Sequence, residues 1–272
     1  MKKLTVGSCF SGIGGLELGL EWTGDFETRW QIEIDPYASA VLRKHWPNVQ
    51  RFSDITTVSN PPRVDVICGG FPCQDVSLAG ARLGLEGKRS TLWSELFRLV
   101  CEVKPRWLVA ENVPGLLSSD GGRFMGNILR DLAGIGFDAE WGVLSAADVG
   151  ARHIRRRIFL LANPRSTREG GEAESRVTPH AIKSCLRLSQ ERDALANANG
   201  ARLERYGNGT VGGAATHSES RISSGWETEP NVGRVAHGIP SRVDRLRCLG
   251  NAVVPQVAQR IGEMILNYEA AT

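Results

Sequence analysis

A thiol and a carboxyl group, each following a short apolar run, are the side chains in this sequence best suited to chemistry. Cys73 ends a Gly-Gly-Phe-Pro-Cys segment, and Glu111 follows the apolar run 107–110. Pro72 fixes its own φ and stiffens the approach to the thiol. A thiolate and a carboxyl group on neighbouring strand ends suit nucleophilic attack on an electron-poor ring, with proton transfer on its far side. The alternative is that Cys73 is one more small apolar residue of the core.

Two arginines extend this candidate catalytic set. Arg155 and Arg157 alternate within an Arg-Arg-Arg-Ile segment, so they would share one face of an extended chain. Two guanidinium groups beside a crevice suit phosphate and pyrimidine oxygen atoms. The competing interpretation is surface charge flanking a strand.

A glycine-rich turn and two acidic residues predict a nucleoside-binding site. Gly12 and Gly14 follow an apolar run, and Glu33 stands 21 residues after Gly12. Glycines permit a tight turn and the close approach of a ligand, and Glu33 can accept hydrogen bonds from both ribose hydroxyls. Asp54 ends a short segment after the next helix and is expected beside the base. A plain turn between a strand and a helix is the alternative.

The residues around this turn also indicate which nucleoside is bound. The sequence has no G-x-x-x-x-G-K-[ST] motif, which makes a nucleoside triphosphate unlikely as a ligand. Glu17 lies in the first helical turn, where a pyrophosphate would sit, and we expect an anion there to repel it. A cofactor that has no phosphate and carries a sulfonium cation fits better, which points to S-adenosyl-L-methionine.

The elements that must position these groups alternate between strands and helices over the first ~160 residues, which is typical of an α/β fold with a parallel sheet. Expected strands are 4–9, 30–34, 64–68, 107–110, 139–144 and 158–162. Expected helices are 16–22, 37–45, 92–103 and 124–133. In such a sheet the carboxyl ends of the strands face the ligand crevice, so the loop 69–85 would display Cys73 there.

A change in composition at residue 164 predicts three parts of the chain. Residues 1–163 form the expected catalytic and cofactor-binding domain, 164–248 a small loop-rich region, and 249–272 a returning helix. The net charge is −3 over residues 1–150 and +7 over 151–248, which suggests a polyanionic partner held by the basic region. A solvated, arginine-rich surface is the alternative.

The composition of the whole chain excludes two classes of protein. Of 272 residues, 41% are hydrophobic and 23% charged, so disorder of the whole chain is excluded. No run approaches ~18 apolar residues, so no membrane-spanning helix is expected. The first residues are too polar for a signal peptide, and we expect a cytoplasmic protein.

The six cysteines contain no C-x-x-C pair, which argues against a zinc site and against a disulfide framework.

Together these motifs resemble those of the DNA (cytosine-5) methyltransferases, over residues 4–162 and 243–269. The matching segments are Phe10–Gly15, Glu33–Asp35, Asp54-Ile55, Gly70–Gln74, Glu111–Val113, Arg155-x-Arg157 and Gly250–Val253. The Pro-Cys and Glu-Asn-Val motifs, in this order and spacing, are very specific, whereas the glycine loop alone is weak.

The resemblance implies a Rossmann-like methyltransferase sheet with helices on both faces, plus a small loop-rich target-recognition subdomain. It also implies a reaction: Cys73 attacks C6 of a flipped-out cytosine, Glu111 holds N3 and supplies its proton, and Arg155 and Arg157 hold the nucleotide. Methyl transfer from S-adenosyl-L-methionine to C5 leaves S-adenosyl-L-homocysteine. The implied cofactor-binding residues are Phe10, Gly12, Ile13, Gly14, Glu33, Ile34, Asp54, Ile55, Pro72, Asn251 and Val253.

The sequence departs from the family pattern in two places. His153 stands where the family usually has Gln, so we assign it no role. The region 164–248 is short for target recognition, yet its position and positive charge predict that it supplies the sequence contacts. Its candidate phosphate contacts are Arg234, Arg242, Arg245 and Arg247, with ordinary surface as the alternative.

The expected partner is double-stranded DNA, with a cognate restriction endonuclease as a further candidate, and the expected state is a monomer. The first rival is a tRNA methyltransferase of the same fold, but such relatives usually carry a Cys-Phe-Thr tripeptide that is missing here. An inactive DNA-binding relative is less favoured because the thiol, carboxyl, arginine and glycine elements all remain. A dehydrogenase is disfavoured by Glu17.

Overall fold

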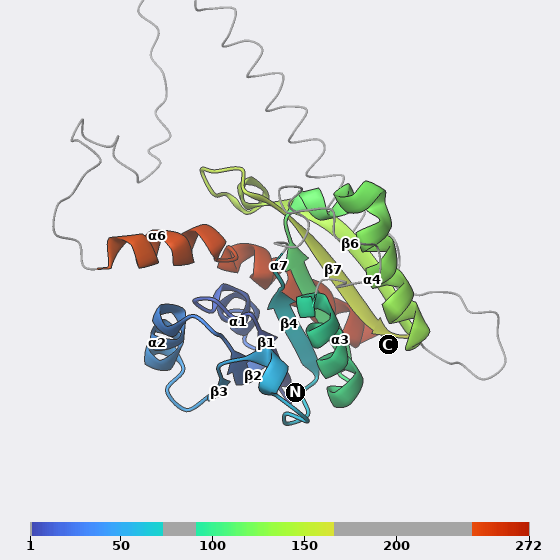
Figure 1. Cartoon of the computed structure of the whole chain (residues 1–272), viewed down its shortest axis with the longest axis horizontal. Helices are drawn as coiled ribbons and strands as arrows, with labels where there is room; N and C mark the ends of the chain where they lie inside the picture. Colours follow the sequence, from blue (N-terminus) through green and yellow to red (C-terminus); the bar gives the residue numbers. More distant parts are fainter. Residues whose placement is uncertain (1, 73–90, 166–240, 272) are drawn as a thin grey trace, which may run out of the picture.

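The computed structural model describes residues 2–72, 91–165 and 241–271. In this part of the chain seven strands form one sheet (Figure 1). The strands are β1 (Leu4–Cys9), β2 (Phe26–Ile32), β3 (Gln50–Phe52), β4 (Val66–Gly70), β5 (Trp107–Asn112), β6 (Phe137–Ser145) and β7 (Arg156–Pro164). The helices are α1 (Gly15–Glu21), α2 (Pro36–His45), α3 (Thr91–Val103), α4 (Arg123–Gly134), α6 (Arg242–Asn251) and α7 (Pro255–Ala271). Short 3₁₀ turns span Ile55–Thr57, Pro114–Leu117, Ser119–Gly122 and Ala146–Val149.

The strand order is β3-β2-β1-β4-β5-β7-β6. Successive strands are added on one side of β1 and then on its other side, so the order reverses beside β1. From β1 the chain moves outward to β2 and β3, and then returns to place β4 on the other side of β1. The first five strands pair in parallel, whereas β7 is antiparallel to both β5 and β6. In an open α/β sheet, ligands bind at such a switch point, outside the carboxyl ends of the strands.

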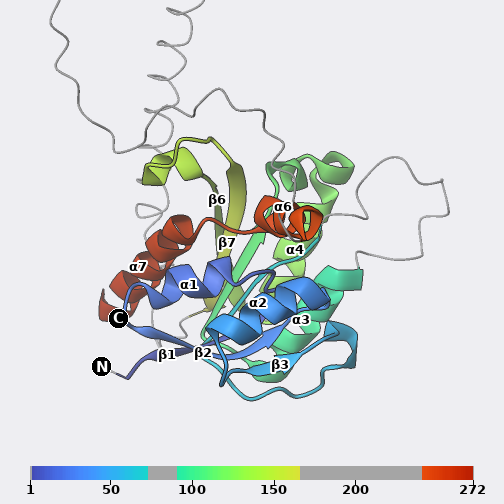
Figure 2. The same cartoon turned by 90° about the vertical axis from the view of Figure 1, so that its left-hand side faces the viewer.

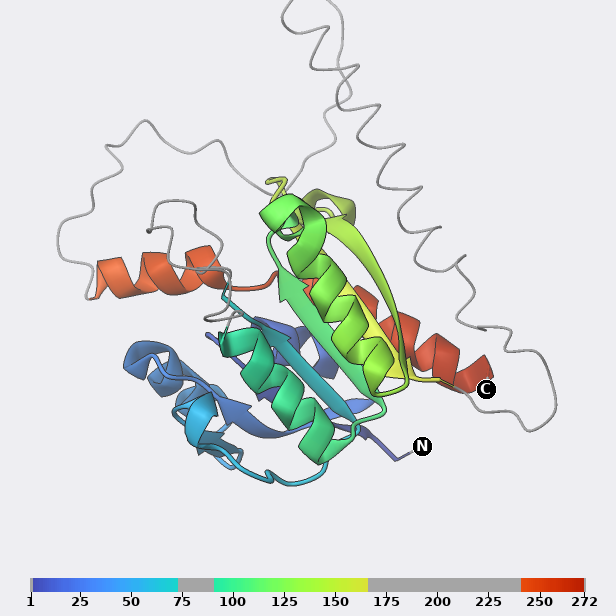
Figure 3. The same cartoon turned by 45° about the vertical axis from the view of Figure 1, so that its right-hand side comes forward.

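Helices cover both faces of the sheet, as Figures 2 and 3 show. α1 and α7 pack on one face, and α3 and α4 pack on the other. The interior strand β5 is buried on both sides, which is why its first four residues form a continuous apolar run. Trp107 and Val109 join the cluster beneath α1 and α7, while Leu108 and Ala110 join the cluster beneath α3 and α4.

Two glycines on α1 allow the C-terminal part of the chain to pack closely against it. A Cβ atom at Gly19 would lie 2.5 Å from the Cβ of Ala258, in α7. A Cβ atom at Gly15 would lie 2.3 Å from the carbonyl oxygen of Val253, just before α7. The C-terminal segment therefore lies beside the glycine turn that begins α1.

The predicted α/β architecture is confirmed, with differences at three strands. β2 begins at Phe26 rather than at Trp30, because exposed Glu27 and Arg29 alternate with buried residues in its first half. β3 was not predicted; it has three residues and lies at the edge of the sheet. β5 continues through Glu111 and Asn112, which pair with the antiparallel strand β7.

α6 begins at Arg242, in the region 164–248 that was expected to be rich in loops, and continues to Asn251. Its large apolar side chains Val243, Leu246 and Leu249 are exposed and its buried residue is Cys248, so its sequence carries no pattern of a packed helix. Of the candidate phosphate contacts, Arg242, Arg245 and Arg247 lie on α6, whereas Arg234 lies outside the described residues, as do residues 166–240 in general and Cys73. None of the described helices combines the length and apolar character needed to cross a membrane.

Candidate functional site

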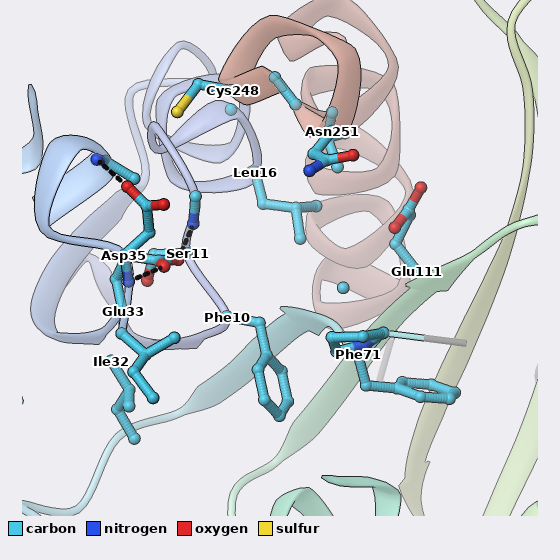
Figure 4. Close-up of a pocket in the computed structure, with 18 of the residues that line it drawn as sticks. Phe10, Ser11, Leu16, Ile32, Glu33, Asp35, Phe71, Glu111, Cys248 and Asn251 are labelled. Atoms are coloured by element: carbon cyan, nitrogen blue, oxygen red, sulfur yellow. Dashed lines mark hydrogen bonds between the residues drawn. The ribbon is translucent and has the colours of Figure 1, made fainter. Parts of the chain in front are cut away.

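A cavity of about 520 Å³ lies at the switch point of the sheet, outside the carboxyl ends of β1, β2, β4 and β5 (Figure 4). That volume suits a nucleoside-sized ligand. α6 extends over α1 and α2 and contributes one wall (Figure 1). The predicted site residues that line the cavity are Phe10, Gly12, Glu33, Ile34, Asp54, Ile55, Pro72, Glu111, Arg157, Asn251 and Val253.

Two backbone N–H groups hold the Glu33 carboxylate at the end of β2. The Gly12 N–H donates to Oε2 at 2.6 Å, and the Asp35 N–H donates to Oε1 at 2.7 Å. Phe10 and Gly12 both have positive φ, at 54° and 56°, and this left-handed backbone turns the loop toward the carboxylate. The remaining lone pairs of Glu33 are available to accept hydrogen bonds from ligand hydroxyls.

Next to Glu33, the cavity has an apolar surface and a second carboxylate, Asp54, whose position is fixed by hydrogen bonds. Ile34 is 72% exposed and lines the cavity together with buried Ile55. Asp54 Oδ1 accepts from the backbone N–H of Thr56 at 2.9 Å and from its hydroxyl at 2.8 Å. These hydrogen bonds lower the pKa of Asp54, so its carboxylate is charged. Such a surface suits the ring and the amino group of a purine.

Glu111 lies on the opposite side of the cavity from Glu33 (Figure 4), and it forms an ion pair with half-buried Arg157. Nε of Arg157 is 2.9 Å from Oε1 of Glu111, which is 8% exposed. Burial raises the pKa of Glu111, while the positive charges of Arg157 and Arg155 act in the opposite direction. Gly70 provides the space, because a Cβ atom there would lie 2.7 Å from Oε2 of Glu111. A carboxyl group in this position can hold a proton and deliver it to a ligand.

The segment that leads to Cys73 is anchored on both sides. The Phe71 ring is buried against Trp93 and Phe124, with ring centroids 5.4 Å and 6.4 Å apart. The side-chain amide of Asn112 donates to the Phe71 carbonyl at 2.9 Å. Pro72 then lines the cavity, and Cys73 itself lies outside the described residues.

Arg155 and Arg157 do not share one face of an extended strand, as the sequence had suggested. Arg155 precedes β7 and has a φ of 27°, so the chain turns there. Its Nη2 donates to the Ala252 carbonyl at 2.6 Å, and it lines a second cavity of about 520 Å³ with Ile13 and His153. Arg157 is thus the arginine of this pair that lines the main cavity.

Two further predicted cofactor residues, Ile13 and Gly14, do not line the main cavity. Ile13 faces the second cavity, and Gly14 begins α1 with a φ of 86°. A Cβ atom at Gly14 would lie 2.5 Å from the ring of Trp46, so this glycine serves packing rather than ligand approach. Neighbouring loop residues line the main cavity instead, namely Ser11, Gly15 and Leu16.

α6 supplies cavity residues that the sequence did not identify as such. Nη2 of Arg247 lies 2.5 Å from Oδ2 of Asp35, and both residues line the cavity with Cys248. Asp35 also caps α2, because its Oδ1 accepts from the backbone N–H groups of Tyr37 and Ala38. The Asp-Pro pair at the start of α2 was a readable capping signal, whereas the contact with α6 depends on the tertiary fold.

The expectation that Glu17 repels phosphate from the cavity is wrong. Glu17 is 0% exposed, and its side chain faces Gln31 of β2 inside the protein. Burial raises the pKa of Glu17, although hydrogen bonds from Ser8, its own backbone, Ser11 and Gln31 act in the opposite direction. The residue does not line the cavity and gives no argument for or against a phosphate ligand.

Comparisons with known proteins agree with this geometry. The profile of the C-5 cytosine-specific DNA methylase family matches residues 4–214. The Type II methyltransferase M2.BsuMI of Bacillus subtilis is 38% identical over 164 residues, which are 59% of this chain and 42% of that protein. M.Sau3AI of Staphylococcus aureus is 36% identical over 179 residues, or 59% and 43% of the two chains.

A solved structure also resembles the fold. A prophage-encoded protein of E. coli, described as a candidate DNA modification methyltransferase, has a TM-score of 0.50 and 29% identity, over 60% of this chain and 47% of that chain. The fold is therefore the Rossmann-like sheet of the methyltransferases. The aligned part spans less than half the length of the two curated relatives. Because the family profile covers most of the sequence, the chain belongs to the C-5 cytosine-specific DNA methylase family.

Proposed function

We propose that this protein is a DNA (cytosine-5) methyltransferase, which transfers a methyl group from S-adenosyl-L-methionine to C5 of a flipped-out cytosine in duplex DNA. The observation that carries the proposal is the Glu111–Arg157 pair, which lies in the same cavity as Pro72, the residue directly before Cys73. This arrangement joins a nucleophile segment to a buried acid, and both share the cavity with the Glu33 site for a nucleoside.

The cavity residues fit the proposed methyl donor. Glu33 would accept from the ribose hydroxyls, while Ile34 and Ile55 would contact the adenine and Asp54 would accept from its amino group. Asn251 and Val253 form the wall that the C-terminal segment contributes. S-adenosyl-L-methionine supplies an electrophilic methyl group when it is bound.

The residues on the other side would activate the cytosine. The Cys73 thiolate donates an electron pair to form a bond with C6, and N3 takes a proton from Glu111. C5 becomes nucleophilic and accepts the methyl group. A base then removes the C5 proton, the C6–S bond breaks to expel the thiolate, and N3 returns its proton to Glu111, which restores both the ring and the enzyme. Base stacking blocks this geometry in a duplex, so the cytosine must be extruded.

The two arginines have different places in this proposal. Arg157 lies on Glu111 in the cavity, so it orients the acid and can contact the extruded base. Arg155 donates a hydrogen bond to the Ala252 carbonyl. It would therefore support the C-terminal wall of the cavity on the side where the nucleotide binds. Ile13 and Gly14 shape the cofactor loop without lining the cavity.

Recognition and assembly complete the proposal. The basic region 164–248 would contact the DNA target, and the enzyme would act as a monomer. A restriction endonuclease that cleaves the same target would be its partner, as the Type II designation of the relatives suggests. Bisulfite sequencing of DNA from cells that express the protein would report the modified base with its neighbours.

Covalent trapping tests the mechanism. The full chain is incubated with S-adenosyl-L-methionine and a randomised duplex pool that contains 5-fluorocytosine, and peptide mapping locates any adduct. We expect a denaturation-resistant complex through Cys73, which Cys73→Ala abolishes together with methyl transfer. Cys101→Ala is the matched control, because this half-buried thiol on α3 does not line the cavity.

Two results would reject parts of the proposal. Undiminished methyl transfer by Cys73→Ala would remove the nucleophile assignment. Methyl transfer to tRNA but not to duplex DNA would retain the chemistry and replace the substrate.

A further inference from the structure

A fully buried polar cluster lies beneath the loop that forms the cofactor side of the cavity. Glu17 from α1, Ser8 from β1 and Gln31 from β2 are each 0% exposed. Nε2 of Gln31 donates to Oε1 of Glu17 at 3.3 Å. The nearby hydroxyls of Ser8 and Ser11 act to lower the pKa of this carboxyl group. We call these four residues the Glu17 cluster. Because Ser11 lines the cavity, the cluster supports the cavity wall from inside the protein.

The cluster also ties the loop to two strands. The Ser11 hydroxyl donates to Oγ of Ser8 at 2.9 Å, and the Ser11 N–H donates to the Ile32 carbonyl of β2 at 3.1 Å. The Gly14 N–H donates to the Ser11 carbonyl at 2.9 Å, which links the same residue to the start of α1. A change in the Glu17 carboxyl group would therefore reach the cavity through Ser11.

The donors and acceptors of the cluster do not balance if Glu17 is charged. Oε2 of Glu17 and Oε1 of Gln31 are buried and have no hydrogen-bond partner among the described residues. A carboxylate has only acceptors, so both oxygens would remain without a donor, which is costly inside a protein. A carboxylic acid supplies one donor, and the Gln31 oxygen is an acceptor that lacks one.

The titratable neighbours of Glu17 do not offer a compensating charge. Burial raises the pKa values of Cys9 and Cys68, so these neighbours are neutral thiols. Burial likewise raises the pKa of Glu17.

We propose that Glu17 is an uncharged carboxylic acid that donates to Gln31 and positions Ser11 at the wall of the cofactor cavity. Glu17 is then a positioning residue, because it acts on the cofactor through the loop and does not touch it. The inference rests on the proposed function in so far as the loop binds S-adenosyl-L-methionine or its product.

Two substitutions separate a neutral acid from a charged one. Glu17→Gln keeps the size and a donor, and we expect the Kd for S-adenosyl-L-homocysteine to remain within about twofold of that of the unaltered protein. Glu17→Ala removes the support of Ser11, and we expect the Kd to rise about tenfold, which corresponds to one lost buried hydrogen bond. Isothermal titration of the full chain measures both.

Infrared spectroscopy reports the proton directly. We expect the difference spectrum near neutral pH, unaltered protein minus Glu17→Gln, to show the C=O stretch of a protonated carboxylic acid, since any band from Glu111 is common to both proteins and cancels. A purely structural role for a charged Glu17 would give no such band.

Glu21 provides a matched control one turn later on the same helix. Its Oε1 accepts from the backbone N–H and the hydroxyl of Thr28, and its Oε2 accepts from the Trp46 indole at 2.9 Å. Both oxygens of this carboxylate accept from donors. In Glu21→Gln one oxygen is replaced by an amide NH₂ group, which is itself a donor and so loses the hydrogen bond that the oxygen accepted. We expect Glu21→Gln to lower the melting temperature, and Glu17→Gln not to lower it at any pH, with a relative gain that grows as pH rises.

The outcomes distinguish this inference from the proposed function. A tenfold loss of affinity in Glu17→Gln, or unchanged affinity in a folded Glu17→Ala, would overturn the inference and leave the proposed function intact. If the unaltered protein binds no S-adenosyl-L-homocysteine but shows the infrared band, the proposed function fails while the neutral acid stands. If Glu17→Ala does not fold, the band and the affinity of Glu17→Gln decide.

Discussion

Three glutamates near the cavity show how surroundings give one residue type three different properties. Glu33 is held by two backbone N–H groups and is free to accept from a ligand. Glu111 is buried but faces Arg157, so burial and charge act on its pKa in opposite directions. Glu17 is buried among hydroxyl and amide groups, and burial dominates. The chemistry of each carboxyl group follows from its neighbours rather than from its type.

The space at Gly70 controls the position of the proposed acid. Gly70→Ala would place a Cβ atom 2.7 Å from Oε2 of Glu111, so we expect the carboxyl group to move and the Arg157 contact to weaken. The single-turnover rate of methyl transfer should fall by about 10²-fold or more, the range for a misplaced acid catalyst. Affinity for S-adenosyl-L-homocysteine should remain, because Glu33 lies on the opposite side of the cavity. A parallel loss of affinity would contradict this assignment.

The pH dependence of the reaction should report the charge of Arg157. Glu111 must be protonated to donate to N3, so activity falls as pH rises through its pKa. Arg157→Gln removes the charge that lowers this pKa, and we therefore expect the alkaline limb of the single-turnover profile to move to higher pH, with a lower maximal rate. Arg156→Gln is the control, because Arg156 is exposed on the other side of the strand. A limb that stays in place would exclude Glu111 as the titrating group.

At the scale of elements, the sequence predicts best where local pattern and tertiary burial coincide. β1, α1, α3 and β5 were predicted because continuous apolar runs or helical periodicity reflect burial against the sheet. β3 and α6 were missed because a short edge strand and a helix with exposed apolar residues carry little such pattern.

The site divides in the same way. The order of the motifs predicted that Glu33, Glu111 and Arg157 belong to one site, and all three line the same cavity. The motifs could not reveal that the Glu17 side chain is buried in the core. That orientation depends on Ser8 and Gln31, which two separate strands bring beneath α1. Likewise, the sequence could not show that Arg155 bonds to Ala252, a partner far away in sequence.

Close packing of α1 on α7 should be sensitive to a single methyl group. Gly19→Ala would place its Cβ atom 2.5 Å from that of Ala258, and we expect the free energy of unfolding to fall by about 1–3 kcal/mol through overpacking. Cofactor affinity should fall too, because Val253 approaches the glycine turn next to these helices. Gly126→Ala in α4 is the control: nothing lies within 4 Å of its added methyl group, and stability should rise or stay equal. Urea unfolding measures both variants, and equal stability of the two would argue against close helix packing.

At the scale of the whole molecule, one sheet carries the two sides of the cavity, which we propose bind the nucleoside and the base, at its switch point. Strands β1 to β3 lead to the Glu33 side, while β4, β5 and β7 lead to the Glu111 side. The antiparallel strand β7 brings Arg157 next to Glu111, which a further parallel strand in that register would not do. The reversed strand is therefore part of the site.

Global stability should depend on pH through Glu17. The carboxyl group is protonated in the folded protein and releases its proton on unfolding above its ordinary pKa of 4.5. The free energy of unfolding therefore falls as pH rises from that value to the raised folded pKa, at up to about 1.4 kcal/mol per pH unit. Glu17→Gln cannot release this proton, so its stability relative to the unaltered protein should increase with pH. Urea unfolding between about pH 5 and about pH 8 tests this. A constant difference over that range would show that Glu17 does not change its charge on unfolding.

The contact between α1 and α7 sets an order of events during synthesis. A ribosome releases the apolar side of α1, with Leu16 and Leu20, long before it releases Pro255–Ala271, which covers that side. Until then, the C-terminal segment that packs against the glycine turn and α1 has not been synthesised. The folded protein consequently forms late, and chaperones have the whole interval of translation in which to bind its first helix.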